Sequence, residues 1–218
     1  MTGGEAPEEG RTWRGQSAEE RRTARRAQLI EAGIELFGTA GYAATSVKAV
    51  CEEAGLTERY FYEAFSDREG LLISIYEILI EDVATDVLNQ MIAVDGDMFK
   101  MMRAGLGTFA RHVTADPRRA KIQQLEVVGV SEALEERRRG AIHAFADLIA
   151  NTTRRFGGED RDDLNLDIVS IGLVGMVNET LVDFVLGKIE TDIETLINNQ
   201  VGIFEALAAV MVPDLKTN

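Results

Sequence analysis

The sequence is poor in cysteine, histidine and proline, and each scarcity excludes a kind of structure. Its single cysteine, Cys51, rules out an internal disulfide framework. One cysteine and two histidines do not supply a zinc site of the usual spacing, so we expect neither a metal nor a cofactor. Only three prolines interrupt the chain, and no segment alternates apolar and polar residues as a half-buried strand does. We therefore expect an all-α fold.

Long apolar runs are missing as well. No stretch reaches the roughly 18 consecutive apolar residues of a membrane-spanning helix, and the N-terminus has no apolar signal core. Membrane insertion and secretion are therefore not expected. Because a lone cysteine also suits a reducing compartment, the sequence predicts a soluble cytoplasmic protein.

The net charge of -14 argues against binding to nucleic acid, since a polyanion attracts basic surfaces. The basic residues are nevertheless concentrated near the N-terminus. Residues 11–26 contain six arginines against two glutamates, whereas residues 71–218 contain 24 acidic and 14 basic side chains. This asymmetry predicts a DNA-facing end. Arg11 and Arg14 could follow a minor groove from a flexible arm, while the other four arginines could equally form a solvated helix face.

Capping patterns and apolar spacing predict about nine helices. Residues 1–16 are rich in Gly, Glu and Pro and are expected to be a flexible tail. Ser17 and Glu20 form a capping-box pattern that starts the first helix, which ends near Gly38. The other helices are predicted at residues 47–54, 58–65, from a Ser66–Glu69 capping box to beyond Leu88, and at about 97–114, 117–130, 132–156, 162–187 and 192–211.

The second and third helices form the pattern of a helix-turn-helix. They are short, and the turn between them, Gly55-Leu56-Thr57, contains glycine. The segment 33–72 around them resembles the DNA-binding domain of the TetR family of bacterial regulators. The resemblance is carried by Leu36-Phe37, Gly41-Tyr42, Thr45-Ser46-Val47, Ala54-Gly55-Leu56-Thr57, Phe61-Tyr62, Phe65, Arg68-Glu69 and Leu71-Leu72.

The resemblance covers the first third of the chain and implies an organisation for the whole of it. We expect a tail at 1–16, a three-helix DNA-binding domain at 17–70, and a larger helical domain for effector binding and dimerisation at 71–218. It also implies a transcription regulator, by default a repressor, that binds a palindromic operator as a homodimer and is released by a small hydrophobic effector. Dimerisation matters because one short helix reads few bases.

The residues expected to contact DNA lie on the two short helices and just after them. Ser46 or Thr45 can offer a hydroxyl and backbone amides to a phosphate, although either could simply cap its helix. Lys48 is expected to reach a base or phosphate, or else to be solvated. Thr57 is expected to cap the recognition helix, with Tyr60 in its first turn.

Three further contacts are predicted with distinct roles. Arg59 is expected to read a guanine, since its guanidinium can pair with O6 and N7. Tyr62 is expected to hydrogen-bond a phosphate, the alternative being a half-buried core tyrosine. Arg68 resembles the basic residue that anchors this family to the DNA backbone. Many relatives have small residues at the positions of Arg59 and Tyr60, so the operator sequence does not follow from the resemblance.

The effector is expected to bind between the fourth helix and the last two, which are apolar enough to pair with a partner subunit. Large adaptable side chains and isolated polar ones mark the candidate lining, although each could equally be ordinary core or surface. The candidate residues are Met102, Phe109, Leu125, Glu126, Phe145, Met176, Asn178 and Glu179.

Two rival functions remain open. An enzyme has little support, because His112 and His143 have no nucleophile motif near them and no glycine-rich phosphate loop occurs. A helical ligand-binding protein with weak or lost DNA binding is suggested by the overall acidity and by Glu58 and Glu63 on the recognition helix. Steep salt dependence of DNA binding would exclude the second rival.

Overall fold

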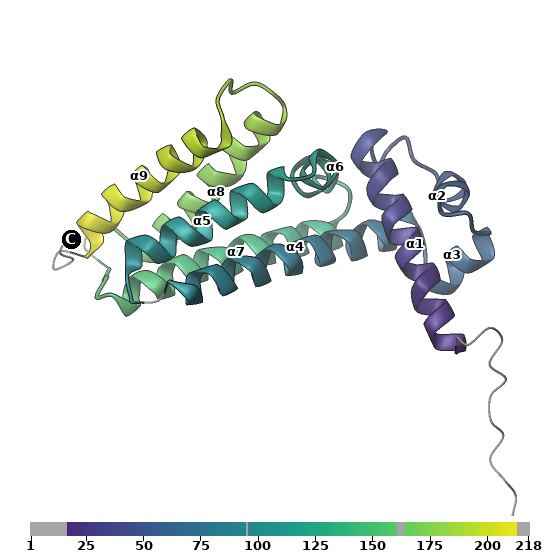
Figure 1. Cartoon of the computed structure of the whole chain (residues 1–218), viewed down its shortest axis with the longest axis horizontal. Coiled ribbons are helices and arrows are strands. Elements are labelled where there is room, and N and C mark those ends of the chain that lie inside the picture. Colours follow the sequence, from purple (N-terminus) through teal and green to yellow (C-terminus); the bar gives the residue numbers. More distant parts are fainter. Residues whose placement is uncertain (1–16, 95, 161–163, 213–218) are drawn as a thin grey trace, which may run out of the picture.

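The computed structural model describes residues 17–94, 96–160 and 164–212, and its elements are helical throughout this part of the chain (Figure 1). The prediction of an all-α fold is confirmed. The helices are α1 (Ala18–Thr39), α2 (Val47–Ala54), α3 (Glu58–Ala64), α4 (Arg68–Ala93), α5 (Met98–Thr114), α6 (Pro117–Lys121), the π-helix η1 (Ile122–Glu126), α7 (Glu132–Arg155), α8 (Leu166–Val185) and α9 (Ile193–Met211). The tail expected at 1–16, with Arg11 and Arg14, lies outside the described residues.

The N-terminal domain is built by α1, α2, α3 and the start of α4. The predicted capping box is present, because the Ser17 side chain accepts from the Glu20 amide and the Glu20 carboxylate accepts from the Ser17 amide. Gly55 ends α2 with φ of 64°, a left-handed conformation that glycine adopts without strain. Phe37 and Phe61 are fully buried between these helices, and this core fixes the angle between α2 and α3.

Helix α4 joins the two halves of the molecule (Figure 1). Its N-cap is Asp67, whose side chain accepts from the Gly70 amide, so the prediction that Ser66 caps this helix was wrong by one residue. Asp is as good a cap as Ser, and the sequence offered both. The first turns pack in the N-terminal core through Leu71 and Leu72, and the later turns pack against α5. The expected domain border at residue 70 therefore falls inside a continuous helix.

The C-terminal domain is a bundle in which α4, α5 and α7 lie beside α8 and α9 (Figure 1). The predicted single helix over 117–130 is wrong after Lys121, where the chain forms η1 and then turns at Gly129 with φ of 72°. A π-helix inserts a residue into the helical turn and is common at functional sites. Neither Pro nor Gly stands at the start of η1, so no helix-breaking residue in the sequence indicated it.

Candidate DNA-binding face and ligand cavities

The recognition helix α3 presents its first turn and its outer side to solvent. Thr57 and Arg59 are exposed, whereas Phe61 on the opposite side is completely buried. Thr57 occupies the N-cap position, but its side chain makes no capping hydrogen bond. The Arg59 side chain is 83% exposed and pairs with Glu63 at 3.0 Å. Because such exposed ion pairs contribute only about 0 to 1 kcal/mol, this contact holds the guanidinium weakly.

The structure distinguishes the hydroxyls of Thr45 and Ser46, which the sequence left as alternative phosphate ligands at the start of α2. Ser46 is the N-cap of α2 and accepts from the Ala49 amide at 3.1 Å, and it is exposed. Thr45 is only 3% exposed, and its hydroxyl donates to the Gly41 carbonyl at 2.8 Å. The buried Thr45 hydroxyl therefore braces the loop, which leaves Ser46 as the hydroxyl at the surface. Lys48 is exposed beside Glu52, 3.6 Å away.

Three aromatic and basic side chains complete this face. Tyr62 is 57% exposed, so it is not a core tyrosine, and its ring packs edge-on against Phe61. Tyr60 is half-buried beneath the guanidinium of Arg25, which lies 4.4 Å from the ring centroid. Arg68 donates to the carbonyls of Tyr42 and Thr45. The expected DNA anchor is therefore also an internal brace of the loop before α2.

The C-terminal domain contains two neighbouring cavities. The first, the apolar cavity, measures about 70 Å³ and has an almost entirely hydrocarbon lining from α4, α5, α7, α8 and α9. The second, the polar cavity, measures about 300 Å³ and is lined from α4, α5, η1, α7 and α8 together with Val128. The cavities share Phe109, Phe145, Val174 and Asn178 as lining residues, so they adjoin.

Five of the eight predicted ligand residues line these cavities. Phe109, Phe145 and Asn178 line both, Met102 lines the apolar cavity, and Glu179 lines the polar one. Leu125, Glu126 and Met176 line neither.

The prediction for Glu126 was wrong, because its carboxylate accepts from the Tyr42 amide at 2.7 Å and lies at the contact between the domains. Sequence reasoning selected Glu126 as a polar residue in an apolar stretch but passed over Gln123, which does line the polar cavity. In an α-helix Gln123 and Glu126 would lie on the same face. The wider turn of the π-helix places their side chains on different faces. Tyr76 and Arg138 were also missed; they come from separate helices, and no local pattern connects them.

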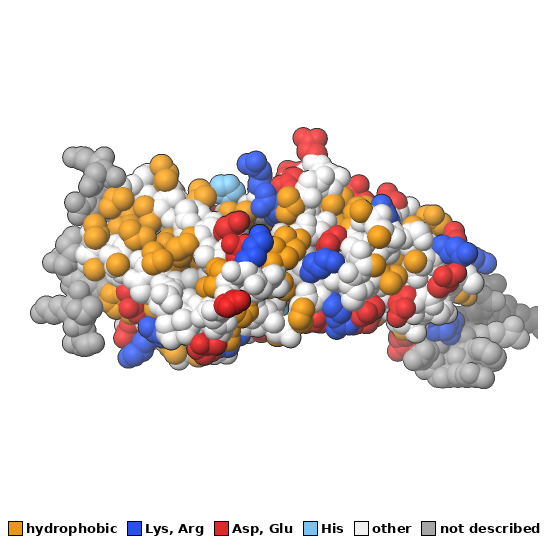
Figure 2. Space-filling view, turned by 90° about the horizontal axis from the view of Figure 1, so that it is seen from above, with side chains coloured by type: hydrophobic (Ala, Val, Ile, Leu, Met, Phe, Trp, Pro, Cys, Tyr) orange, Lys and Arg blue, Asp and Glu red, His pale blue; other side chains and the backbone are white. Residues whose placement is uncertain are grey.

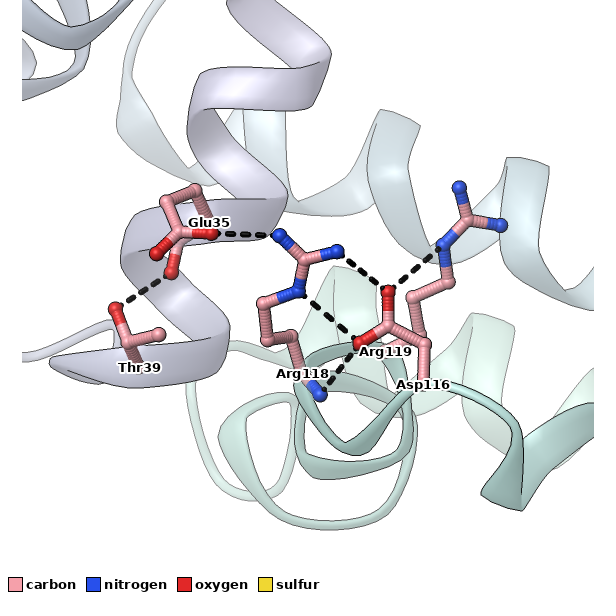
Figure 3. A network of polar contacts seen from close by, with 5 residues as sticks. All are labelled: Glu35, Thr39, Asp116, Arg118 and Arg119. Atoms are coloured by element: carbon pink, nitrogen blue, oxygen red, sulfur yellow. Dashed lines mark hydrogen bonds and ion pairs between the residues drawn. The ribbon is translucent and has the colours of Figure 1, made fainter.

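Polar contacts tie α6 and its N-cap, Asp116, to the end of α1 (Figure 3). Arg118 bonds Glu35 of α1 at 2.6 Å and Asp116 at 2.7 Å. Hydrogen bonds from Arg118 hold the pKa of Asp116 below its usual range. The Lys121 amine donates to the Thr39 carbonyl at 2.9 Å. The N-terminal domain is thus held by the short segment 116–126, which also contributes Gln123 to the polar cavity.

The outer side of α8 and α9 is apolar. Ile168 is 71% exposed and Ile203 is 45% exposed, and a Cβ added at Gly172 or Gly202 would meet no atom within 4 Å. Figure 2, which views the molecule from the α8 and α9 side of Figure 1, shows hydrophobic side chains gathered over this end. By length and composition α8 could also cross a membrane. Only 28% of its most apolar window is buried within the protein. Exposed apolar patches of this kind are typical of interaction surfaces.

Comparison with known proteins connects these features to a family. Residues 29–75 match the sequence model of "Bacterial regulatory proteins, tetR family". The chain is similar to the HTH-type transcriptional regulator YuxN of Bacillus subtilis, with 33% identity over 28% of this chain and 21% of that protein. It is also similar to the fatty acid metabolism regulator protein of the same organism, with 20% identity over 79% of this chain and 89% of that protein.

Solved structures extend the likeness to the whole fold. The fatty acid degradation regulator FadR from Bacillus halodurans superposes with a TM-score of 0.71 at 16% identity, covering 89% of this chain and 97% of that one. FadR from Bacillus subtilis, solved with stearoyl-CoA, gives 0.68 at 18% identity, covering 87% and 99%. Residues 29–75 therefore resemble the DNA-binding segment of tetR-family regulators, and the chain as a whole shares the fold of these solved regulators.

Proposed function

We propose that the protein is a transcriptional repressor that binds a palindromic operator as a homodimer and leaves it when a small hydrophobic effector binds. The observation that carries this proposal is the pairing of an exposed recognition helix with an uncovered apolar face at the far end of the chain. A single α3 has seven residues and reads few bases. Two copies related by a two-fold axis read two half-sites of an inverted repeat.

On the DNA, Arg59 is proposed to read a guanine, worth about 1 to 3 kcal/mol of discrimination. Its pair with Glu63 is too exposed to compete strongly with that contact. Ser46, Lys48, Thr57, Tyr60 and Tyr62 are assigned to phosphates or neighbouring base edges. Arg68 and the buried Thr45 support these contacts from behind by fixing the loop before α2.

A second copy of the chain is proposed to cover the apolar face of α8 and α9. Ile168, Ile171, Ile203 and Val210 are exposed on it, and the uncovered glycines allow the helices of two subunits to approach closely. A membrane is the alternative cover for α8. We favour the protein partner, because α8 also lines both cavities of the bundle and packs against α7. The protein is accordingly proposed to be cytoplasmic, with no membrane partner.

The effector is proposed to bind in the two cavities. FadR of Bacillus subtilis, which shares the fold, was solved with stearoyl-CoA, and this supports a ligand with a long apolar part. The segment 116–126 gives a route from the cavities to the DNA, since Gln123 lines the polar cavity and Glu126 holds the Tyr42 amide. A ligand that binds better when this segment is displaced would shift the recognition helices, and operator DNA would then weaken effector binding equally.

Selection of bound fragments from random double-stranded DNA tests the proposal. We expect a palindromic consensus, and binding that weakens steeply with salt because phosphate contacts release counterions. The rival, a ligand-binding protein without DNA function, is favoured only by the acidity of the chain and by Glu63 beside Arg59. It predicts no enrichment of any sequence and no salt-dependent retention of DNA.

A further inference from the structure

The polar cavity is lined by polar side chains that bond no other protein group in the described part of the chain. Gln123 is only 6% exposed and Tyr76 only 4%, and both line this cavity. Among the described residues, no hydrogen bond is formed by the amide of Gln123 or the hydroxyl of Tyr76. Their polar atoms face the open space of the cavity, so water or a ligand bound there can satisfy them.

Other polar groups of the same cavity make it rich in donors. Arg138 lines it, and Glu135 accepts from Nε and Nη2 of this guanidinium, which leaves Nη1 outside that pair. Burial raises the pKa of Tyr76 to about 12, so its hydroxyl stays protonated near neutral pH and can donate. The Asn178 amide stands where the polar cavity meets the apolar one. The exposed carboxylate of Glu179 is the one acidic group among the lining residues.

The volumes of the two cavities fit a ligand that occupies both. Pockets for drug-sized ligands measure roughly 300 to 1,000 Å³, so the apolar cavity, at about 70 Å³, is too small alone. The polar cavity, at about 300 Å³, supplies most of the space. A ligand that uses both must have an apolar part next to Phe109 and Leu106, and a polar part next to Gln123 and Tyr76.

We propose that the polar cavity binds the oxygen-bearing head of an amphipathic ligand, a carboxylate or the carbonyl of its thioester, while the alkyl tail enters the apolar cavity. Gln123, Tyr76 and Arg138 donate to the head, and Phe109 and Phe145 flank the start of the tail. This inference rests on the proposed effector function and names the chemistry of its ligand. Because Gln123 lies on η1, the head also contacts the segment that holds the DNA-binding domain.

The test measures binding to the full-length protein without DNA, by isothermal titration calorimetry at concentrations below micelle formation. Laurate and lauroyl-CoA are the two arms for a free acid and a thioester, and dodecyltrimethylammonium has an equal tail with a cationic head. We expect laurate, lauroyl-CoA or both to bind at least tenfold more tightly than the ammonium compound. Tighter binding of the ammonium compound, or binding of none of the three, would overturn the proposal.

Substitutions in the polar cavity test where the polar head of the ligand binds. Gln123→Leu keeps the size of the side chain and removes its amide, and we expect about a five- to tenfold loss of affinity for whichever oxygen-headed ligand binds. Tyr76→Phe removes only the hydroxyl and gives a second variant should Gln123→Leu fold poorly. Gln200→Leu is the matched control, because Gln200 is 2% exposed and lines neither cavity. Unchanged affinity in both cavity variants would contradict the assignment.

Operator binding separates this inference from the proposed function. A gel shift with the selected DNA does not depend on the head group, so intact DNA binding without any ligand binding would reject the cavity assignment alone. Absence of DNA binding together with tight laurate binding would instead reject the repressor and leave the cavity assignment standing.

Discussion

The two halves of this protein differ in how completely they fill their interior, pair their polar groups and cover their apolar surface. In the N-terminal domain Phe37 and Phe61 are completely buried, and no residue of α1, α2 or α3 lines either cavity. In the C-terminal domain two adjoining cavities remain, polar groups stand in one of them without partners, and a broad apolar face is uncovered. The difference accords with our proposal that the first half reads DNA, whereas the second is completed by a ligand and by a second subunit.

The largest expected effect compares two phenylalanines. Phe61 is completely buried in the N-terminal core, so Phe61→Ala should destabilise the domain by about 3 to 5 kcal/mol. Phe109 lines both cavities and already borders empty space, so Phe109→Ala should cost clearly less. Urea unfolding of both variants, followed by circular dichroism, measures the two losses. Equal losses would contradict the contrast between the halves.

The next prediction concerns the uncovered face. Ile203→Asp places a charge in the proposed subunit interface, where it would be desolvated without a partner. We expect monomers in sedimentation experiments and a loss of operator affinity of at least a hundredfold, with the helical content unchanged. Glu205→Asp, on the same helix but retaining its charge near Arg103, is the control. A variant that stays dimeric would place the interface elsewhere.

A smaller effect is expected at the recognition helix. Arg59→Ala should weaken specific binding by about 1 to 3 kcal/mol and relax the base preference at one position of each half-site. Binding measured on a set of single-base operator variants reveals both changes. Arg22→Ala, which removes an exposed arginine of α1 paired with Glu19, serves as a comparison. If base preference survives in Arg59→Ala, another residue reads the DNA.

The smallest expected effect lies at the contact between the halves. Glu126→Gln keeps an oxygen acceptor for the Tyr42 amide but removes the charge, which weakens a charge-assisted hydrogen bond. We expect DNA affinity to change by less than about threefold, and the effector concentration that releases half of the DNA to fall. Fluorescence anisotropy of labelled operator measures both quantities. An unchanged effector response would remove η1 from the proposed route.

The helices of the N-terminal domain could be predicted from the sequence because the patterns that determine them are local. A capping box at Ser17, a left-handed glycine at Gly55 and an apolar spacing that buries Phe61 and Phe65 each depend on residues within one or two turns. The cavities depend instead on side chains that meet from different helices, such as Tyr76 with Gln123. A π-helix without a helix-breaking residue also rotated Glu126 out of the cavity, which no α-helical spacing could foresee.

The most direct test of the account is selection of bound fragments from random DNA by the full-length protein, with its mass in solution measured in parallel. The account predicts a dimer and an enriched inverted repeat whose half-site centres lie about one or two helical turns apart. A protein that remains monomeric and enriches no sequence at moderate salt would contradict it.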